Sequence, residues 1–235
     1  CKEKFRLDLD MGSCDLHLKG VIIPMLTPFK DDEELDEESI REYTSWLIEN
    51  GVHGLFPNSS MGEAPKLLLS ERKKMIDIVV DEANGKVPVC AGTGEVSTKA
   101  TIELTRHAKD AGADAVVIVE PYYIHPSEEA LLDHYRTISE KVDIPIIVYD
   151  IPEATGYSLP AELVAQLAEI NNVVAVKDSS CDMMKFIREV RLVGDKIDVL
   201  QGAESLFVAS LVMGGSGGIL GIASACPRFT VEIYN

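Results

Sequence analysis

The chain has 235 residues, of which 46% are hydrophobic and 26% charged, a composition typical of a globular protein and not of a disordered one. Its 22 basic and 39 acidic residues give a formal net charge of −17. Nucleic-acid binding by phosphate neutralisation requires many Lys and Arg residues, so this charge excludes that class and disfavours an anionic membrane surface. A small anionic substrate is compatible with it, because backbone N–H groups bind anions whatever the net charge.

Short apolar, β-rich segments alternate along the chain with longer amphipathic segments. The short segments predict eight strands, at 20–26, 54–58, 87–91, 115–120, 145–150, 173–178, 198–202 and 218–222. Between them the pattern predicts seven helices, near 37–50, 70–84, 98–111, 127–141, 160–170, 182–194 and 204–213. Several of the strands are continuous hydrophobic runs, which is typical of parallel strands covered on both faces.

Residues at the predicted helix ends agree with this division. Ser70, Ser97 and Ser127 are expected N-caps, and Pro160 suits a first turn. Glycine follows four of the helices at the place where a left-handed residue would end them: Gly51, Gly85, Gly112 and Gly194.

The alternation predicts an α/β protein with a (β/α)8 TIM barrel as its catalytic domain, residues 20–235, after an N-terminal extension, residues 1–19. An open, doubly wound sheet is the alternative. The chain stops at Asn235, where the eighth helix is expected to begin, so the C-terminal helices are predicted to be missing. Residues 205–227 carry no charge, but their glycines favour a short helix, a turn and a buried strand over a membrane span.

Cysteine and histidine patterns argue against metal and disulfide chemistry. The five cysteines are far apart and form no C-x-x-C pair, which favours a reducing, cytoplasmic location. The five histidines show no metal-ligand spacing. We predict no metal and no cofactor.

The chemistry of a TIM barrel lies at the C-terminal ends of its strands. Period-two alternation points Lys177, which ends the sixth predicted strand, and Tyr149, which ends the fifth, into the barrel mouth. Desolvation there favours a neutral amine, the form that attacks a ketone, and a neighbouring phenol can move protons. The alternatives are a lysine that reaches solvent beside Asp178, and a core tyrosine whose hydroxyl binds a backbone carbonyl.

Two glycine-containing turns follow other strands. The turn NSSMGEAP, residues 58–65, predicts an N–H-rich pocket for a carboxylate. AGTGE, residues 91–95, lacks the third glycine of G-x-G-x-x-G, so a nucleotide loop is not favoured. The glycines at 214–218 precede the eighth strand and are therefore expected at the end opposite the site.

Six motifs in this order resemble the dihydrodipicolinate synthase / N-acetylneuraminate lyase family of class I, pyruvate-handling aldolases. They are GVIIPMLTPF, SSMGE, VCAGTGEVST, EPYYIHPSEE, VYDIPEATG and VAVKDSS. The resemblance runs from about Gly20 to Arg228. It implies a (β/α)8 barrel that binds pyruvate and an aldehyde, and a homo-oligomer, since family members usually form dimers or tetramers.

The resemblance also implies roles for three residues in the reaction. Lys177 would form the Schiff base with pyruvate, and Tyr149 would be the proton relay. Tyr123 matches the tyrosine that completes a relay across a subunit interface in the synthases.

Four further residues match substrate-binding positions of the family. Ser60 and Met61 match the pair of hydroxyl residues that hold the pyruvate carboxylate. Met61 departs from this pattern and removes one hydroxyl donor; because such a bond to a charged group is worth about 1.5–3 kcal/mol, weaker pyruvate binding is expected. Gly202 and Glu204 match positions that contact the polar tail of the substrate in the sugar-acid enzymes.

The segment that follows Tyr149 bears on the choice of reaction. The synthases normally carry, at the position of Ala154, an Arg that binds the carboxylate of the aldehyde substrate. PEATG instead resembles archaeal-type 2-keto-3-deoxygluconate aldolases, Asp150 replaces the usual Asn, and PYYIHPSEE is closer to the synthases. The resemblance therefore favours a 2-keto-3-deoxy sugar-acid aldolase. The alternatives are 4-hydroxy-tetrahydrodipicolinate synthase, N-acetylneuraminate lyase and a non-catalytic keto-acid-binding protein.

Overall fold

A closed ring of parallel strands forms the centre of the molecule. The computed structural model describes Leu16 and residues 18–235. The strands are β1 (Gly20–Pro24), β2 (Gly54–Phe56), β3 (Cys90–Gly92), β4 (Ala115–Val119), β5 (Ile146–Asp150), β6 (Val173–Asp178), β7 (Asp198–Gln201) and β8 (Gly217–Ile219). Their order is β2-β1-β8-β7-β6-β5-β4-β3, and the parallel bridge Leu55↔Val89 joins its two ends. The predicted (β/α)8 barrel is confirmed, and the open sheet is excluded.

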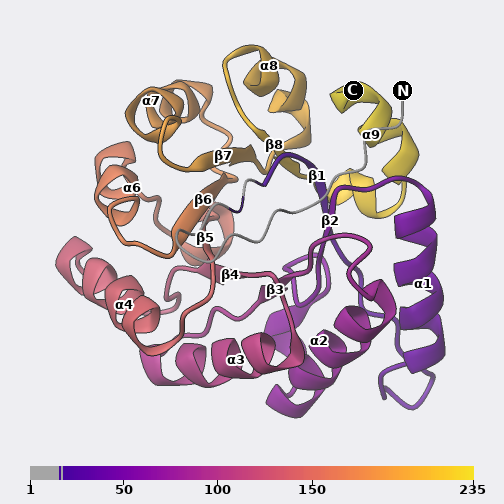
Figure 1. Cartoon of the computed structure of the whole chain (residues 1–235). Coiled ribbons are helices and arrows are strands. Elements are labelled where there is room, and N and C mark those ends of the chain that lie inside the picture. The colour runs from indigo at the N-terminus through magenta and orange to yellow at the C-terminus, as the bar shows by residue number, and fades with distance from the viewer. Residues whose placement is uncertain (1–15, 17) are drawn as a thin grey trace.

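Helices surround the barrel as an outer ring (Figure 1). They are α1 (Glu37–Glu49), α2 (Leu69–Ala83), α3 (Thr98–Ala111), α4 (Glu128–Lys141), α6 (Ala161–Leu167), α7 (Met183–Val193), α8 (Phe207–Val212) and α9 (Pro227–Tyr234). The short helix α5 (Pro152–Thr155) directly follows β5. Short 3-10 turns lie at η1 (Ala64–Lys66), η2 (Glu204–Leu206) and η3 (Gly221–Ser224).

Most of the predicted helix caps are present. Ser97 and Ser127 accept the N–H groups of Ala100 and Ala130, as expected of N-caps. Ser70 is not a cap, because α2 begins one residue earlier and Glu71 accepts the N–H of Leu68 instead. Of the four predicted helix-ending glycines, Gly51, Gly85 and Gly112 have positive φ, whereas Gly194 has a right-handed φ of −65°.

The inside of the barrel is filled by side chains that alternate with outward-facing ones along each strand, such as Ile22, Phe56, Ile147 and Leu200. Leu18 joins this cluster, and its N–H donates to Asp198 Oδ2 at 2.7 Å. The packed barrel therefore begins before Gly20, inside the predicted extension; residues 1–15 and 17 of that extension lie outside the described residues.

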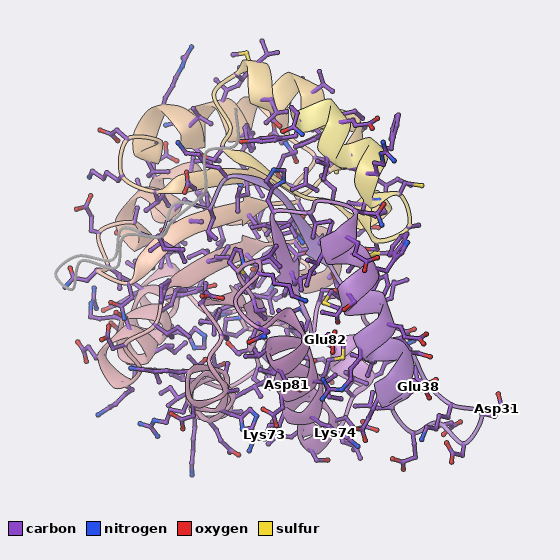
Figure 2. The ribbon with its side chains drawn as sticks, turned by 45° about the vertical axis from the view of Figure 1, so that its right-hand side comes forward. Asp31, Glu38, Lys73, Lys74, Asp81 and Glu82 are labelled. Carbon is purple, nitrogen blue, oxygen red and sulfur yellow. The ribbon has the colours of Figure 1, made fainter. Side chains whose placement is uncertain are left out.

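The outer side of α1 and α2 is charged. Figure 2 shows Lys73, Lys74, Asp81 and Glu82 along α2. Arg41 of α1 pairs with Asp81 at 2.6 Å and with Glu82 at 3.3 Å. Because the Arg41–Asp81 pair is solvent-exposed, we expect it to add little to stability.

The last part of the described chain contains the beginning of the expected helix after the eighth strand. This helix, α9, follows β8 and contacts β1, and the Tyr234 ring lies 5.2 Å from that of His53. The uncharged stretch folds as predicted, into α8, a glycine turn and β8. Among the described residues, no helix is long and apolar enough to cross a membrane.

Gly217 allows β8 to close against β1. A Cβ at this position would lie 2.1 Å from the carbonyl oxygen of Gly20, which is backbone and cannot move aside without opening the pairing. We expect Gly217→Ala to lower the free energy of unfolding by about 3 kcal/mol, measured by thermal or denaturant unfolding. Gly85→Ala is the control, because a Cβ at Gly85 would have no neighbour within 4 Å. Its only penalty is the left-handed φ of +69°, which costs an alanine about 1–2 kcal/mol. Equal losses in the two variants would contradict the expectation.

Candidate functional site

Two predicted site residues lie side by side inside the barrel. β5 pairs with β6 so that Tyr149 is opposite Lys177, and both are buried, at 4% and 3% exposure. The Nζ of Lys177 lies 3.7 Å from the centroid of the Tyr149 ring and 5.4 Å from that of Phe56. The amine does not reach solvent, and within the described residues it forms no hydrogen bond or ion pair. It is thus a desolvated amine against two aromatic rings.

The hydroxyl of Tyr149 faces the turn that follows β2. It lies 3.4 Å from Ser60 Oγ, and not on a backbone carbonyl. Ser59 fixes this turn: its hydroxyl donates to Met25 O at 3.0 Å and accepts the N–H of Gly62 at 3.0 Å. The N–H groups of Ser60 and Met61 form no hydrogen bond with the described part of the chain. Two amide donors and a hydroxyl are therefore available to a carboxylate beside Tyr149.

A cavity of about 270 Å³ opens next to these groups. Its walls include Phe56, Ser60 and Tyr149 of the residues just described, together with parts of β3, β4 and α5. They are Phe56, Asn58, Ser60, Ala64, Pro65, Arg72, Gly92, Gly94, Val117, Val119, Tyr122, Tyr149, Ile151, Ala154 and Thr155. Lys177 is not itself part of the described lining, but its amine lies against the rings of Phe56 and Tyr149, which are.

The other four predicted site residues do not line this cavity. Met61 and Glu204 approach each other at Gly221, where a Cβ would lie 3.2 Å from the sulfur and 2.9 Å from a carboxylate oxygen. Gly202 donates its N–H to Asp178 O at 2.7 Å and packs on Ser179. Tyr123 is 90% exposed, with a φ of +74°. Of the predicted set, the side chains of Lys177, Tyr149 and Ser60 are brought together, and Met61 adds only its backbone N–H.

Sequence reasoning missed the charged side of the cavity. Arg72, on α2, is buried, forms an ion pair with Glu95, and donates to the carbonyl oxygens of Gly92 and Gly94. Tyr122 lies in the same wall, whereas the sequence singled out its neighbour Tyr123. The helical pattern around Arg72 gave no signal, because an arginine on an amphipathic helix is usually exposed.

A buried carboxyl group lies behind α5. Glu120, which follows β4, is fully buried, and its Oε1 lies 2.8 Å from the hydroxyl of Thr155. Burial, together with the charge of Asp150, raises the pKa of Glu120 to about 8. The group is therefore a neutral acid at neutral pH. Within the described residues, no group of three or more His, Cys, Asp or Glu side chains is arranged to hold a metal ion.

A buried lysine at the C-terminal end of a TIM-barrel strand can bind a ketone substrate as a Schiff base, which is the chemistry of class I lyases. This chain is a pyruvate aldolase of that class. It belongs to the dihydrodipicolinate synthetase family, whose model matches residues 17–235. This confirms the resemblance drawn from the six motifs.

Individual relatives agree with this assignment. The chain is 43% identical to 4-hydroxy-tetrahydrodipicolinate synthase of Methanothrix thermoacetophila over 218 residues, which are 92% of this chain and 73% of that protein. It is also 43% identical to an uncharacterized DapA-like lyase of Pyrobaculum aerophilum, with 93% and 73% covered. The fold is similar to that of dihydrodipicolinate synthase from Thermotoga maritima, with a TM-score of 0.89 and 34% identity over 92% of this chain and 75% of that one. The chain thus spans about three-quarters of the length of these relatives.

Proposed function

We propose that this pyruvate aldolase cleaves and forms a 2-keto-3-deoxy sugar acid, with an uncharged polyhydroxy aldehyde as its second substrate. The observation that carries the proposal is Ala154, which lines the cavity where the synthases of the resemblance place a carboxylate-binding Arg. Arg72 is the one cationic side chain in the described cavity wall, and Glu95 and two carbonyl groups already bind it. A second substrate carboxylate would therefore lack a cationic partner.

The proposed reaction assigns a role to each of the three grouped residues. Lys177 attacks the ketone of the sugar acid, and the resulting imine accepts the electron pair as the C3–C4 bond breaks. Tyr149 takes the proton from the hydroxyl that becomes the aldehyde and returns it in the synthetic direction. Ser60 and the free N–H groups of its turn bind the carboxylate next to the ketone.

A second candidate is 4-hydroxy-tetrahydrodipicolinate formation from pyruvate and aspartate semialdehyde. It is favoured by the names of relatives that are 41–43% identical to this chain. Aspartate semialdehyde carries a carboxylate, so the two candidates differ in the charge of the second substrate.

The two reactions are compared in one experiment. Pyruvate release from 2-keto-3-deoxygluconate and condensation of pyruvate with aspartate semialdehyde are measured on the same enzyme. We expect a higher kcat/KM for the sugar acid. A higher kcat/KM for the semialdehyde would overturn the proposal and establish the second candidate.

Ala154→Arg tests the reason for this preference. A guanidinium in the cavity wall gives a carboxylate a charged hydrogen bond worth about 1.5–3 kcal/mol. We therefore expect the preference for the sugar acid over aspartate semialdehyde to shift by about 10- to 150-fold toward the semialdehyde. Ala154→Met is the control for added bulk and should not produce this shift. An unchanged ratio in Ala154→Arg would mean that position 154 does not contact the second substrate.

We also infer a homo-oligomer in which Tyr123 reaches the site of a second copy. Its 90% exposure and left-handed backbone project the ring away from its own barrel. This inference is supported by the family resemblance, in which the matching tyrosine acts across an interface.

A further inference from the structure

A lysine and three carboxylates are buried together on the outer side of the barrel wall, behind the reacting residues. Lys185 of α7 lies 2.8 Å from Asp150, 3.2 Å from Asp178 and 2.6 Å from Glu189. The carboxylates are at most 2% exposed, and the Lys185 side chain is 13% exposed. Such a cluster is costly to bury and is weak evidence for a contribution to stability, so its position relative to the site is the feature to consider.

The strands connect this cluster directly to the site. Asp150 follows Tyr149 on β5, and Asp178 follows Lys177 on β6. Because successive side chains of a strand point to opposite faces, each aspartate points outward where its neighbour points inward. A single ammonium therefore binds the ends of both strands that carry the reacting groups.

Other contacts hold each aspartate in place. Asp150 accepts the hydroxyl of Ser158 at 2.9 Å and the N–H of Leu159 at 3.2 Å. Asp178 accepts the N–H of Ser180 at 2.7 Å. The backbone pairs β5 with β6 up to Asp150 and Asp178, and the ammonium adds a side-chain link between the same two strand ends.

We propose that Lys185 is a positioning residue, which binds Asp150 and Asp178 and thereby holds Tyr149 and Lys177 in their reacting arrangement. The proposal rests on the proposed roles of Tyr149 and Lys177. Lys185 touches no substrate in this arrangement, and it acts through the two strands.

The charges of the cluster add a pH dependence. Burial alone would lower the pKa of Lys185, but its three carboxylates raise that pKa above the ordinary value, so the ammonium stays charged. Burial and the charge of Asp178 raise the pKa of Glu189 to about 8, against the opposing effect of Lys185. Glu189 therefore gives up its proton at a higher pH than an ordinary glutamate does.

Loss of the proton from Glu189 would disturb this arrangement. In the described part of the chain, Asp178 Oδ2 is buried with no partner besides the ion pair with Lys185, and Glu189 Oε2 is buried with no hydrogen-bond partner. An ionised Glu189 would repel Asp178 and draw the ammonium toward α7. The folded-state pKa of about 8 lies above the ordinary value of 4.5, so the stability from this proton is complete below about pH 4.5 and is lost as the pH rises through 8. Glu120, which faces Asp150 from the end of β4, has a pKa raised into the same range.

The first experiment measures imine formation in Lys185→Met. Adduct with pyruvate is trapped by borohydride at successive times and several pyruvate concentrations, and counted by intact mass. We expect the rate at saturating pyruvate to fall about 100-fold, the cost of roughly 1 Å of misplacement, with the half-saturating concentration changed less than about threefold. Lys185→Arg, which keeps the charge, should recover most of the rate. Lys196→Met, which removes an exposed lysine paired with Glu169, is the control.

Two outcomes separate this proposal from the proposed function. If the parent protein is not trapped at all, Lys177 is not a Schiff-base residue and both fail. If the parent is trapped and folded Lys185→Met is trapped at the same rate, only the positioning role is overturned.

If Lys185→Met does not fold, Glu189→Gln tests the proposal instead, because glutamine resembles the protonated acid. The trapping rate of the parent should fall above about pH 8 as Glu189 ionises, whereas Glu189→Gln should keep its rate through that range. Glu120→Gln is measured in parallel, and its trapping rate should still fall above about pH 8, as in the parent. Identical pH profiles for the parent and Glu189→Gln, or a fall abolished by Glu120→Gln alone, would overturn the proposal.

Discussion

Replacement of Lys177 by alanine is expected to abolish the covalent adduct with pyruvate and to lower the aldol rate by more than about 10⁴-fold, the order of loss seen when a covalent nucleophile is removed. The amine lies against the rings of Phe56 and Tyr149 with no ionic partner in the described part of the chain, so no other group there replaces it. Intact mass after pyruvate and borohydride should show a gain of about 72 Da, one reduced pyruvate, on the parent and none on the variant.

Lys66→Ala is the matched control for this measurement, because Lys66 is an exposed lysine on the turn after β2 and pairs with Glu63. It should be trapped like the parent. A mass gain on Lys177→Ala would mean that another lysine reacts. A folded parent that gains no mass would leave the barrel as a keto-acid-binding protein.

Tyr149→Phe is expected to have the second-largest effect. The variant keeps the aromatic ring that contacts Lys177 and the edge contact with Phe56, whose centroid lies 6.4 Å away, so the fold should be retained. It removes the hydroxyl that faces Ser60. Because proton transfer by a positioned group contributes about 10²–10⁴-fold, we expect kcat to fall by that factor.

The control for this loss is Tyr157→Phe, which removes another half-buried hydroxyl, one that donates to Pro121 O at 2.8 Å outside the grouped residues. It should lower the free energy of unfolding by about 1 kcal/mol and leave kcat nearly unchanged. Equal kcat values for Tyr149→Phe and the parent, with Tyr157→Phe unchanged, would exclude the relay role.

The barrel could be predicted because its strands are buried on both faces and therefore stand out as apolar runs. Apolar runs do not fix strand bounds. The third strand is predicted at 87–91 but pairs at Cys90–Gly92, since Pro88 has no N–H for a ladder. Ser70 is the predicted cap of α2, but the Glu71 side chain accepts the N–H of Leu68 and the helix starts earlier. Such choices depend on side-chain contacts that a hydrophobic pattern does not encode.

The part of the site that lies on strands could be predicted, because side chains along a strand alternate between its two faces. Tyr149 and Lys177 are found by alternation alone, because their strands are regular up to their last residues. Arg72 and Lys185 were missed, because each lies on a helix whose pattern predicts an exposed charge, and their burial depends on carboxylates far away or on other elements. Tyr122 and Tyr123 could not be distinguished by period in an irregular loop, and only their surroundings place one in the cavity wall and the other in solvent.

The position of β8 has a consequence for the newly made chain. β8 is three residues long, yet it pairs with both β7 and β1. While the chain is being synthesised, one edge of β1 and one edge of β7 stay unpaired until residues 217–219 have left the ribosome. Unpaired strand edges can pair with other chains and so promote aggregation. A three-residue strand, the last of the eight barrel strands to be made, therefore covers both exposed edges.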